Sequence, residues 1–429
     1  MNNGQADNSN GLIERYGRGI IRWRWLVLLA SFAAMALSFY SISQNVKFST
    51  DYRDFFGPDN PQVLAFDKIE NDYTKLDQIS FILAPEEGTV LNTRIIESMR
   101  WMTEEGWKLP YATRVDSLTN FQHTTAMGDD LNVEPLVVEE GEITQADVER
   151  VRDVALNEPL LADSLISKNL SAPGQYGAVA VTYTLPKKKL SETPEAVAAA
   201  RDLEQRYMEK YPGVKIYMVG PTMLSVAFLE GSKNDSVNLT PLQYLVIVAV
   251  LWLLLRSVSG LISTMLVITA SALAAFGIST AMGITITSIT AVTPTIIMTL
   301  AVADSIHLLV AMLLQMRKGA SRDDALVESL RLNMGPVFLT SITTAVGFLS
   351  MNFSDSPPLR DLGNISAIGV MMAFIFSVTT LPAVMAILPV KVRQSEDRIA
   401  AFSTRYGGWL VGRWQAALVI SAVVIASFS

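Results

Sequence analysis

Long apolar runs separated by short polar segments dominate the chain. Most of them approach the roughly 20 residues that a membrane-spanning helix needs, and the shorter ones can gain a turn at each end. The pattern therefore predicts six spanning helices and the start of a seventh. The six runs cover residues 25–43, 242–255, 261–282, 289–316, 337–351 and 362–388, and the seventh opens near Trp414.

The basic residues between these runs predict their direction across the membrane. Lys and Arg collect before the first span and in alternate loops after it, and the other short loops hold only Arg360. Retained cytoplasmic loops are rich in Lys and Arg, so we expect a cytoplasmic N-terminus and place the segment between the first two spans outside. The residues that set this orientation are Arg15, Arg18, Arg22, Arg24, Arg256, Arg317, Lys318, Arg322, Arg331, Lys391, Arg393, Arg398, Arg405 and Arg413.

The first apolar run has a second interpretation, a cleaved signal peptide, because Ala34-Met35-Ala36 resembles a cleavage site. A repeat argues for a retained helix instead. RYGRGII at 15–21 recurs as RYGGWLV at 405–411, each time just before an apolar run. Transporters built from parallel repeats show such internal similarity. We therefore expect the chain to be the first half of a duplicated protein, ending inside the first helix of the second half.

The segment between spans one and two alternates like a soluble α+β domain. Each of its two parts reads as strand, helix, strand, and two such units favour a ferredoxin-like split sheet. The strands are expected at 78–84, 113–118, 177–185 and 214–220, and the helices at 93–109 and 193–211. A longer piece between the two units holds the acidic loop 139–142 and a helix over 144–156 that opens with a capping box.

These patterns give a complete domain layout. We expect a polytopic α-helical membrane protein with a ferredoxin-like, porter-type periplasmic domain, corresponding to the first half of a duplicated architecture. Its parts are a cytoplasmic segment (1–24), the first span (25–43), the periplasmic domain (44–240), a bundle of spans two to six (241–390), a cytoplasmic linker (391–413) and the start of a seventh span (414–429).

Composition and charge narrow the class of function. Half of the 429 residues are hydrophobic and 17% are charged, too apolar for an ordinary soluble protein. The chain has no cysteine and two histidines, which leaves no thiolate nucleophile and makes a histidine-based zinc site improbable. Residues 45–240 carry 31 acidic and 19 basic side chains, and this acidic domain argues against nucleic acid as a partner.

Two ionisable residues stand inside the fourth span. Asp304 lies near mid-depth and His307 follows three residues later, one turn towards the cytoplasm. A charge at the bilayer centre costs roughly 2.5 to 3.5 kcal/mol even on the gentlest scale, and such residues mark ion or proton paths. Burial disfavours ionisation, so this carboxyl could exchange a proton near neutral pH. We predict that Asp304 carries protons, with His307 either a relay partner or a packing residue.

Hydroxyl groups on the fifth span are candidates to support that relay. Thr340, Ser341, Thr343 and Thr344 place hydroxyls on more than one helix face, and some could reach Asp304. Small polar residues also serve helix packing in membranes, so both roles stay open. No nucleotide-binding, hydrolase or metalloprotease motif accompanies them, and we expect neither a cofactor nor a metal.

The stretch from Arg317 to Pro382 carries a family resemblance. It contains RKGASRDDALVESL, GPVFLTSITTAVGFLSMNFSDSPPLRDLG, IGVMMAF and TLPAV, and it resembles the resistance-nodulation-division (RND) permeases. The nearest likeness is to the branch of MmpL-like and hopanoid transporters. The resemblance implies two six-helix halves, a sterol-sensing-like bundle, and proton-driven export of lipids or other hydrophobic molecules, with Asp304 in the position of the proton carrier. Four residues before Asp304, where this family commonly has a glycine, the chain has Leu300.

The resemblance also implies partners and a location. We expect a multi-pass protein of the bacterial inner membrane, with its large loop in the periplasm. Its partners would be a lipid or similar substrate, the second half of the same protein, a second or third copy in a dimer or trimer, and a periplasmic accessory protein.

Two rival functions remain. A lipid-binding sensor or scaffold would use the same bundle without pumping, and Asp304 would then be structural. An intramembrane aspartyl protease needs a second aspartate in the membrane. Asp355 and Asp361 both fall in a loop at its edge, so we discount the protease.

Overall fold

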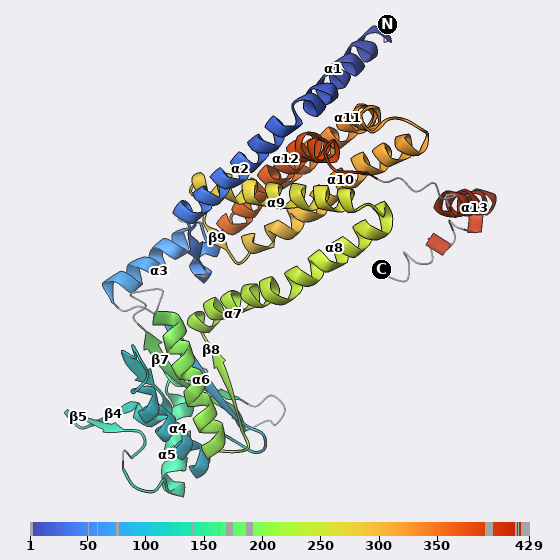
Figure 1. Cartoon of the computed structure of the whole chain (residues 1–429). Coiled ribbons are helices and arrows are strands. Elements are labelled where there is room, and N and C mark those ends of the chain that lie inside the picture. Colours follow the sequence, from blue (N-terminus) through green and yellow to red (C-terminus); the bar gives the residue numbers. More distant parts are fainter. Residues whose placement is uncertain are drawn as a thin grey trace.

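A computed structural model shows a bundle of long helices joined to a separate domain of strands and shorter helices (Figure 1). It describes residues 3–49, 51–57, 59–73, 77–138, 140–162, 164–168, 175–185, 192–390, 398–416, 418 and 420–421. Three sequence predictions lie partly outside these ranges: the seventh span after Trp414, the start of the cytoplasmic linker with Lys391 and Arg393, and Glu139 of the acidic loop.

Among the described residues, six helices are long and apolar enough to cross a membrane, in agreement with the six predicted spans. By length and composition they cover Arg24–Asn45, Pro221–Leu255, Val258–Ala281, Thr290–Arg317, Arg322–Phe353 and Pro357–Met385. The helices that build them are α2 (Arg24–Asn45), α7 (Pro221–Asn234), α8 (Thr240–Leu255), α9 (Val258–Ala281), α10 (Thr293–Arg317), α11 (Arg322–Leu349) and α12 (Pro357–Met385). Helix α1 (Asn3–Arg22) precedes them and α13 (Arg398–Gly412) follows.

Two of these spans are longer than their apolar runs. Helix α7 leaves the soluble domain and continues into α8 through a π-helical turn, η3 (Asp235–Leu239) (Figure 1). Helix α11 joins the predicted cytoplasmic helix to the fifth span, with Pro336 inside it. Proline removes only one helical hydrogen bond, and in a bundle neighbouring helices offset that loss. For these two spans, the apolar run alone therefore predicted a helix start that lies later in the chain than the observed start.

The outer surface of the bundle is apolar. Large hydrophobic side chains stay exposed along α2 and α8, among them Leu29, Leu37, Leu245 and Leu253. A patch of this extent would be a liability in water, whereas hydrocarbon solvates it without cost. The exposed faces therefore fit contact with lipid.

Small residues and hydroxyls let the helices approach closely inside the bundle. Helix α2 packs on α9 and α12. The Ser41 hydroxyl donates to the Gly277 carbonyl at 2.7 Å, and Ser31 and Thr380 share a hydrogen bond of 2.7 Å. These contacts make α2 a part of the bundle, as the retained-span interpretation predicts.

The soluble domain is built on an antiparallel sheet in the order β3-β7-β2-β8, with β6 added beside β7. Strand β2 lies between β7 and β8 and pairs with both. The bounds are β2 (Asp77–Pro85), β3 (Arg114–Asp116), β6 (Ile166–Lys168), β7 (Tyr176–Leu185) and β8 (Val214–Val219). The four strands expected from the alternation are therefore present, with shifted ends.

Two helices complete the core of this domain. Helices α4 (Thr93–Gly106) and α6 (Glu192–Lys210) bury apolar faces in the cluster that also contains the sheet residues Ile79 and Phe81. A hydrogen bond of 2.8 Å between Ser98 and Tyr207 joins the two helices. Helix α5 (Gln145–Asn157) begins with the predicted capping box of Thr144 and Asp147. The short η2 (Leu118–Asn120) and the hairpin of β4 (Gln122–Met127) and β5 (Asp130–Pro135) complete the domain.

Short elements connect the domain to the bundle. After α2 come β1 (Phe48–Ser49), the 3₁₀ turn η1 (Tyr52–Phe55) and α3 (Pro61–Asp72). Strand β1 pairs in parallel with β9 (Ile286–Thr287), which lies in the loop before η4 (Thr290–Val292) and α10. The last short turn, η5 (Ser350–Phe353), separates α11 from α12. The junction thus pairs with the loop that leads into the helix carrying Asp304.

Candidate functional site

Asp304 lies near the middle of α10, on its buried face. Its exposure is 7%, and the neighbouring Ser305 is fully buried. Helix α10 packs against α9, α11 and α12, so the carboxyl is inside the bundle as expected for a functional group in a membrane helix. Within the described part of the chain, no basic side chain forms an ion pair with it.

Ser341 is the hydroxyl that the structure brings to Asp304. Its Oγ lies 3.5 Å from Asp304 Oδ2, a long contact, and 2.8 Å from the Val337 carbonyl oxygen. One hydroxyl hydrogen can serve only one acceptor well, and the shorter distance favours Val337. The Ser341 oxygen can then accept a hydrogen bond from a protonated Asp304, while an ionised Asp304 would draw the hydrogen towards itself.

The other predicted site residues are not gathered around the carboxyl. His307 is exposed on α10 and has no hydrogen bond or ion pair within the described ranges. Thr340 and Thr343 are also exposed, and their hydroxyls donate to carbonyl groups of their own helix. Thr344 is half-buried. Of the four hydroxyl candidates, only Ser341 reaches Asp304 among the contacts of the described residues.

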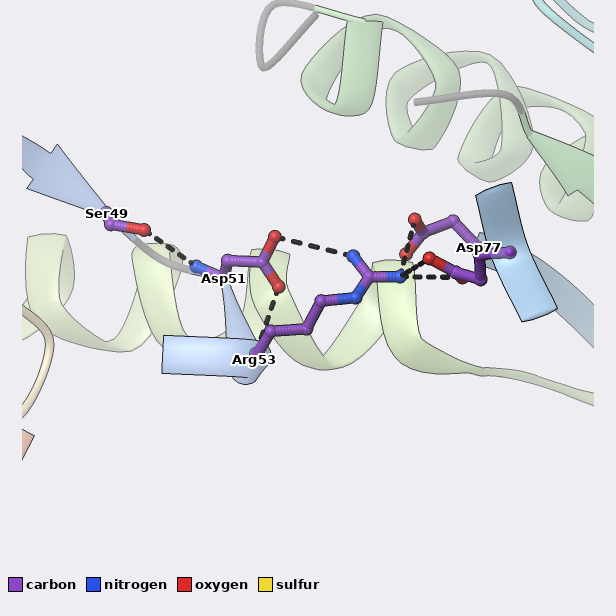
Figure 2. Close-up of polar contacts among 5 residues, drawn as sticks. Ser49, Asp51, Arg53 and Asp77 are labelled. Carbon is purple, nitrogen blue, oxygen red and sulfur yellow. Dashed lines mark hydrogen bonds and ion pairs between the residues drawn. The ribbon is translucent and has the colours of Figure 1, made fainter. Parts of the chain in front are cut away.

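An ion cluster at the junction was not anticipated from the sequence. Figure 2 shows Arg53, on η1, between the carboxylates of Asp51 and Asp77. Its Nη2 donates to Glu70 Oε1 at 2.9 Å and to Asp77 Oδ2 at 3.1 Å, and its Nη1 lies 3.5 Å from Asp51 Oδ2. Asp77 opens the central strand β2 and is fully buried, and Glu70 belongs to α3. Arg53 therefore ties η1, α3 and the sheet together.

The electrostatics of this cluster favour a permanently charged guanidinium. Burial alone would lower the pKa of Arg53, but Asp77 above all, with Glu70, outweighs burial and raises that pKa above its ordinary value. The Arg53 side chain also lies over the rings of Tyr52 and Phe66, at 5.0 Å and 5.9 Å from their centroids. The sequence feature that could have predicted this cluster is DYRD at 51–54, where one arginine stands between aspartates shortly after the first span.

The cluster is connected through β1 to the loop that precedes α10. Ser49, in β1, accepts a hydrogen bond of 3.3 Å from the Asp51 backbone nitrogen (Figure 2). Beside it, the Ile286 nitrogen donates to the Lys47 carbonyl at 2.8 Å, and the Thr287 nitrogen donates to the Thr290 hydroxyl at 2.8 Å. Hydrogen bonds thus join the junction to the loop that leads into α10.

A bundle of six candidate spans with a buried carboxyl, joined to a mixed α/β domain, defines the class of a polytopic membrane protein. No group of three or more His, Asp or Glu in the described ranges is placed to hold a metal. Residues 113–421 match the family described as the MMPL family. Because this match covers well over half of the chain, the protein belongs to the MMPL family.

Two curated relatives agree with this assignment. A protein named as a membrane protein, ActII-3 of Streptomyces coelicolor, is 27% identical over 197 residues, which are 44% of this chain and 28% of that protein. Another, MJ1562 of Methanocaldococcus jannaschii, is 22% identical over 355 residues, or 80% of this chain and 85% of that protein. The match to ActII-3 thus spans less than a third of that relative's length.

Proposed function

We propose that this protein is a proton-driven transporter of the RND type, which moves lipids or other hydrophobic molecules across or out of the inner membrane. Asp304 carries the proposal, because it is a carboxyl buried to 7% exposure inside a spanning helix, with no basic partner among the described side chains. Membership of the MMPL family supports it. The family is one of membrane proteins of transporter type.

The energetics explain why a lone carboxyl suits this role. An ionised Asp304 costs roughly 2.5 to 3.5 kcal/mol more at mid-membrane than at the surface, so the protonated and ionised forms stabilise different packings of α10 against α11. Moving one proton through 100 mV yields about 2.3 kcal/mol. Each methylene group buried in the membrane stabilises a lipid there by about 0.8 kcal/mol. The free energy from a few protons is therefore enough to remove an alkyl chain from the membrane only in several steps.

The proposed relay extends beyond Asp304 and Ser341. His307, Thr340 and Thr343 are exposed in this chain, and in the proposal a second half of the same protein covers them. His307 would then receive or return the proton on the cytoplasmic side of Asp304, and the threonine hydroxyls, with Thr344, would support its passage.

The soluble domain supports a porter-type role. Its strand order β8-β2-β7-β3, with one helix after β2 and one after β7, supports the ferredoxin-like split β-α-β fold that we propose for it. In the proposal this domain lies in the periplasm of a bacterial cell and receives the substrate from the membrane. Assembly into a dimer or trimer, and a periplasmic accessory protein, remain part of the proposal.

Replacing Asp304 by asparagine tests the function. The full-length protein is reconstituted in vesicles with an imposed pH gradient, and two signals are followed: release of a fluorescent single-chain lipid and entry of protons. We expect Asp304→Asn to reduce both to the level of empty vesicles, because the amide cannot carry a proton. Asp323→Asn, an exposed carboxyl at the start of α11, should behave like the parent.

The same experiment separates the transporter from the sensor or scaffold. A sensor would bind the lipid with or without the gradient, would not move it, and would bind equally well as Asp304→Asn. Undiminished lipid movement by a folded Asp304→Asn protein would refute the proton-driven mechanism.

A further inference from the structure

A cavity of about 650 Å³ lies at the junction between bundle and soluble domain. This volume is within the range of small-molecule sites, about 300–1,000 Å³. Its apolar wall consists of Tyr52, Phe56, Val63, Phe66 and Pro221, from η1, α3 and the start of α7. Helices α3 and α7 lie where the bundle meets the domain (Figure 1).

A second, narrower cavity of about 360 Å³ continues the first towards the bundle. The two share Arg53, Phe56, Val63 and Asp67. The narrow part is acidic, because Asp54 and Asp361 join Asp67 in its wall beside Thr285 and Thr287. One side of the combined space is therefore aromatic and the other carries three carboxyl groups.

The basic side chain in these walls offers little to an anion. Arg53 is the basic member of both described linings, and its guanidinium already contacts Asp51, Glu70 and Asp77. By contrast, Asp67 has no ion pair or hydrogen bond to any described residue, and the buried Asp54 Oδ2 has no hydrogen-bond partner there. The carboxylates, rather than the guanidinium, are left to meet a ligand.

We propose that this junction cavity binds an amphiphile with a positively charged head group. The alkyl chain packs on Tyr52, Phe56 and Phe66, and the ammonium head lies among Asp54, Asp67 and Asp361. Aromatic rings beside carboxylates are a recurrent arrangement for ammonium groups. The inference rests on the proposed transport function and specifies its substrate class, since an anionic head would meet repulsion in the same place.

Photolabelling of the full-length protein in lipid nanodiscs tests the site without a gradient. Three probes share one alkyl chain with a diazirine and differ in the head: trimethylammonium, a neutral sugar, or sulfonate. We expect the ammonium probe to label the peptide spanning residues 52–78 most strongly and the sulfonate probe least. Excess dodecyltrimethylammonium should compete with this labelling, and dodecyl sulfate should not.

Variants assign the preference to a named carboxyl. We expect Asp67→Asn to lower labelling by the ammonium probe about fivefold, the upper end for a partly exposed ion pair, and to leave the sugar probe unchanged. Asp67→Glu should retain the preference, as should Asp72→Asn, a control on the same helix that does not line the cavity. Phe66→Ala should weaken labelling by the ammonium and sugar probes alike.

Two results would overturn the proposal: equal labelling by ammonium and sulfonate probes, or unchanged ammonium labelling in Asp67→Asn. Neither depends on the pH gradient. If the parent protein were labelled by the ammonium probe but released no lipid under the gradient, the result would count against the transport mechanism alone. If it released lipid normally but the ammonium probe did not label residues 52–78, the result would count against this site alone.

Discussion

Ser341 stands between two acceptors, and among the described residues it is the polar partner that another helix gives to the Asp304 carboxyl. The Val337 carbonyl takes its hydrogen at 2.8 Å, while Asp304 lies at 3.5 Å. Protonation of Asp304 turns that long contact into a hydrogen bond donated by the carboxyl. The serine is therefore expected to hold the protonated form in place rather than to carry the proton itself.

Removing this hydroxyl should slow transport without abolishing it. We expect Ser341→Ala to lower proton-coupled lipid release about fivefold, equivalent to about 1 kcal/mol for one hydrogen bond. Thr343→Ala is the matched control, because its exposed hydroxyl bonds only to its own helix. Equal rates for Ser341→Ala and the parent would show that the contact has no role in the cycle.

Arg53 differs from Ser341 because its partners are charged. They are among the most buried charges in the soluble domain. The side chains of Asp77 and Glu70 are 0% and 6% exposed. We expect Arg53→Gln to destabilise the domain by about 3–5 kcal/mol, because it removes a cation that the buried carboxylates of Glu70 and Asp77 contact. Hydrogen exchange of the β2 amides in the intact protein measures the change.

A compensating variant checks this explanation. Adding Glu70→Gln and Asp77→Asn to Arg53→Gln removes the uncompensated charge and should restore much of the protection of β2. If the triple variant exchanged as fast as Arg53→Gln alone, packing of the arginine stem rather than its charge would explain the loss.

At the scale of elements, helix α2 is held against α9 by a close approach at one glycine. A Cβ placed on Gly277 would lie 2.5 Å from the Ser38 Cα, a backbone atom that cannot move aside cheaply. The apolar pattern predicts both helices from their own residues. The crossing point depends on which glycine meets which partner.

Substitution of that glycine should loosen the pair. We expect Gly277→Ala to destabilise the bundle by about 1–3 kcal/mol, the usual range for overpacking, and to lower the midpoint of thermal unfolding of the purified protein. Gly347→Ala on α11 adds a methyl group where nothing lies within 4 Å, and its midpoint should match the parent. Equal midpoints for the two variants would contradict a tight α2–α9 contact.

Element ends were the least predictable part of the fold. The predicted second span begins at residue 242, but the helix extends back through η3 into α7. A hydrophobicity count detects where lipid begins, while helical hydrogen bonds continue wherever the backbone stays regular. The same reasoning explains why the predicted cytoplasmic helix and fifth span form a single α11.

At the scale of the whole molecule, the basic residues predict one orientation, with the soluble domain outside and the α10–α11 loop inside. The chain contains no cysteine, so single cysteines can report each side. We expect Glu149→Cys, at an exposed position of α5, to react with an impermeant maleimide in intact spheroplasts. Asp323→Cys should react only after the membrane is opened, and the reverse pattern would contradict the orientation.

The sequence by itself determined the membrane class, the six candidate spans and the strands and helices of the soluble domain, and it singled out Asp304 as the candidate site residue, because apolar length, alternation and the cost of a membrane charge are local properties. Only the tertiary structure decided that Ser341 rather than His307 lies beside Asp304, and that Arg53 gathers Asp51, Glu70 and Asp77. Such contacts join residues from separate elements, and only the packing of those elements brings them within bonding distance.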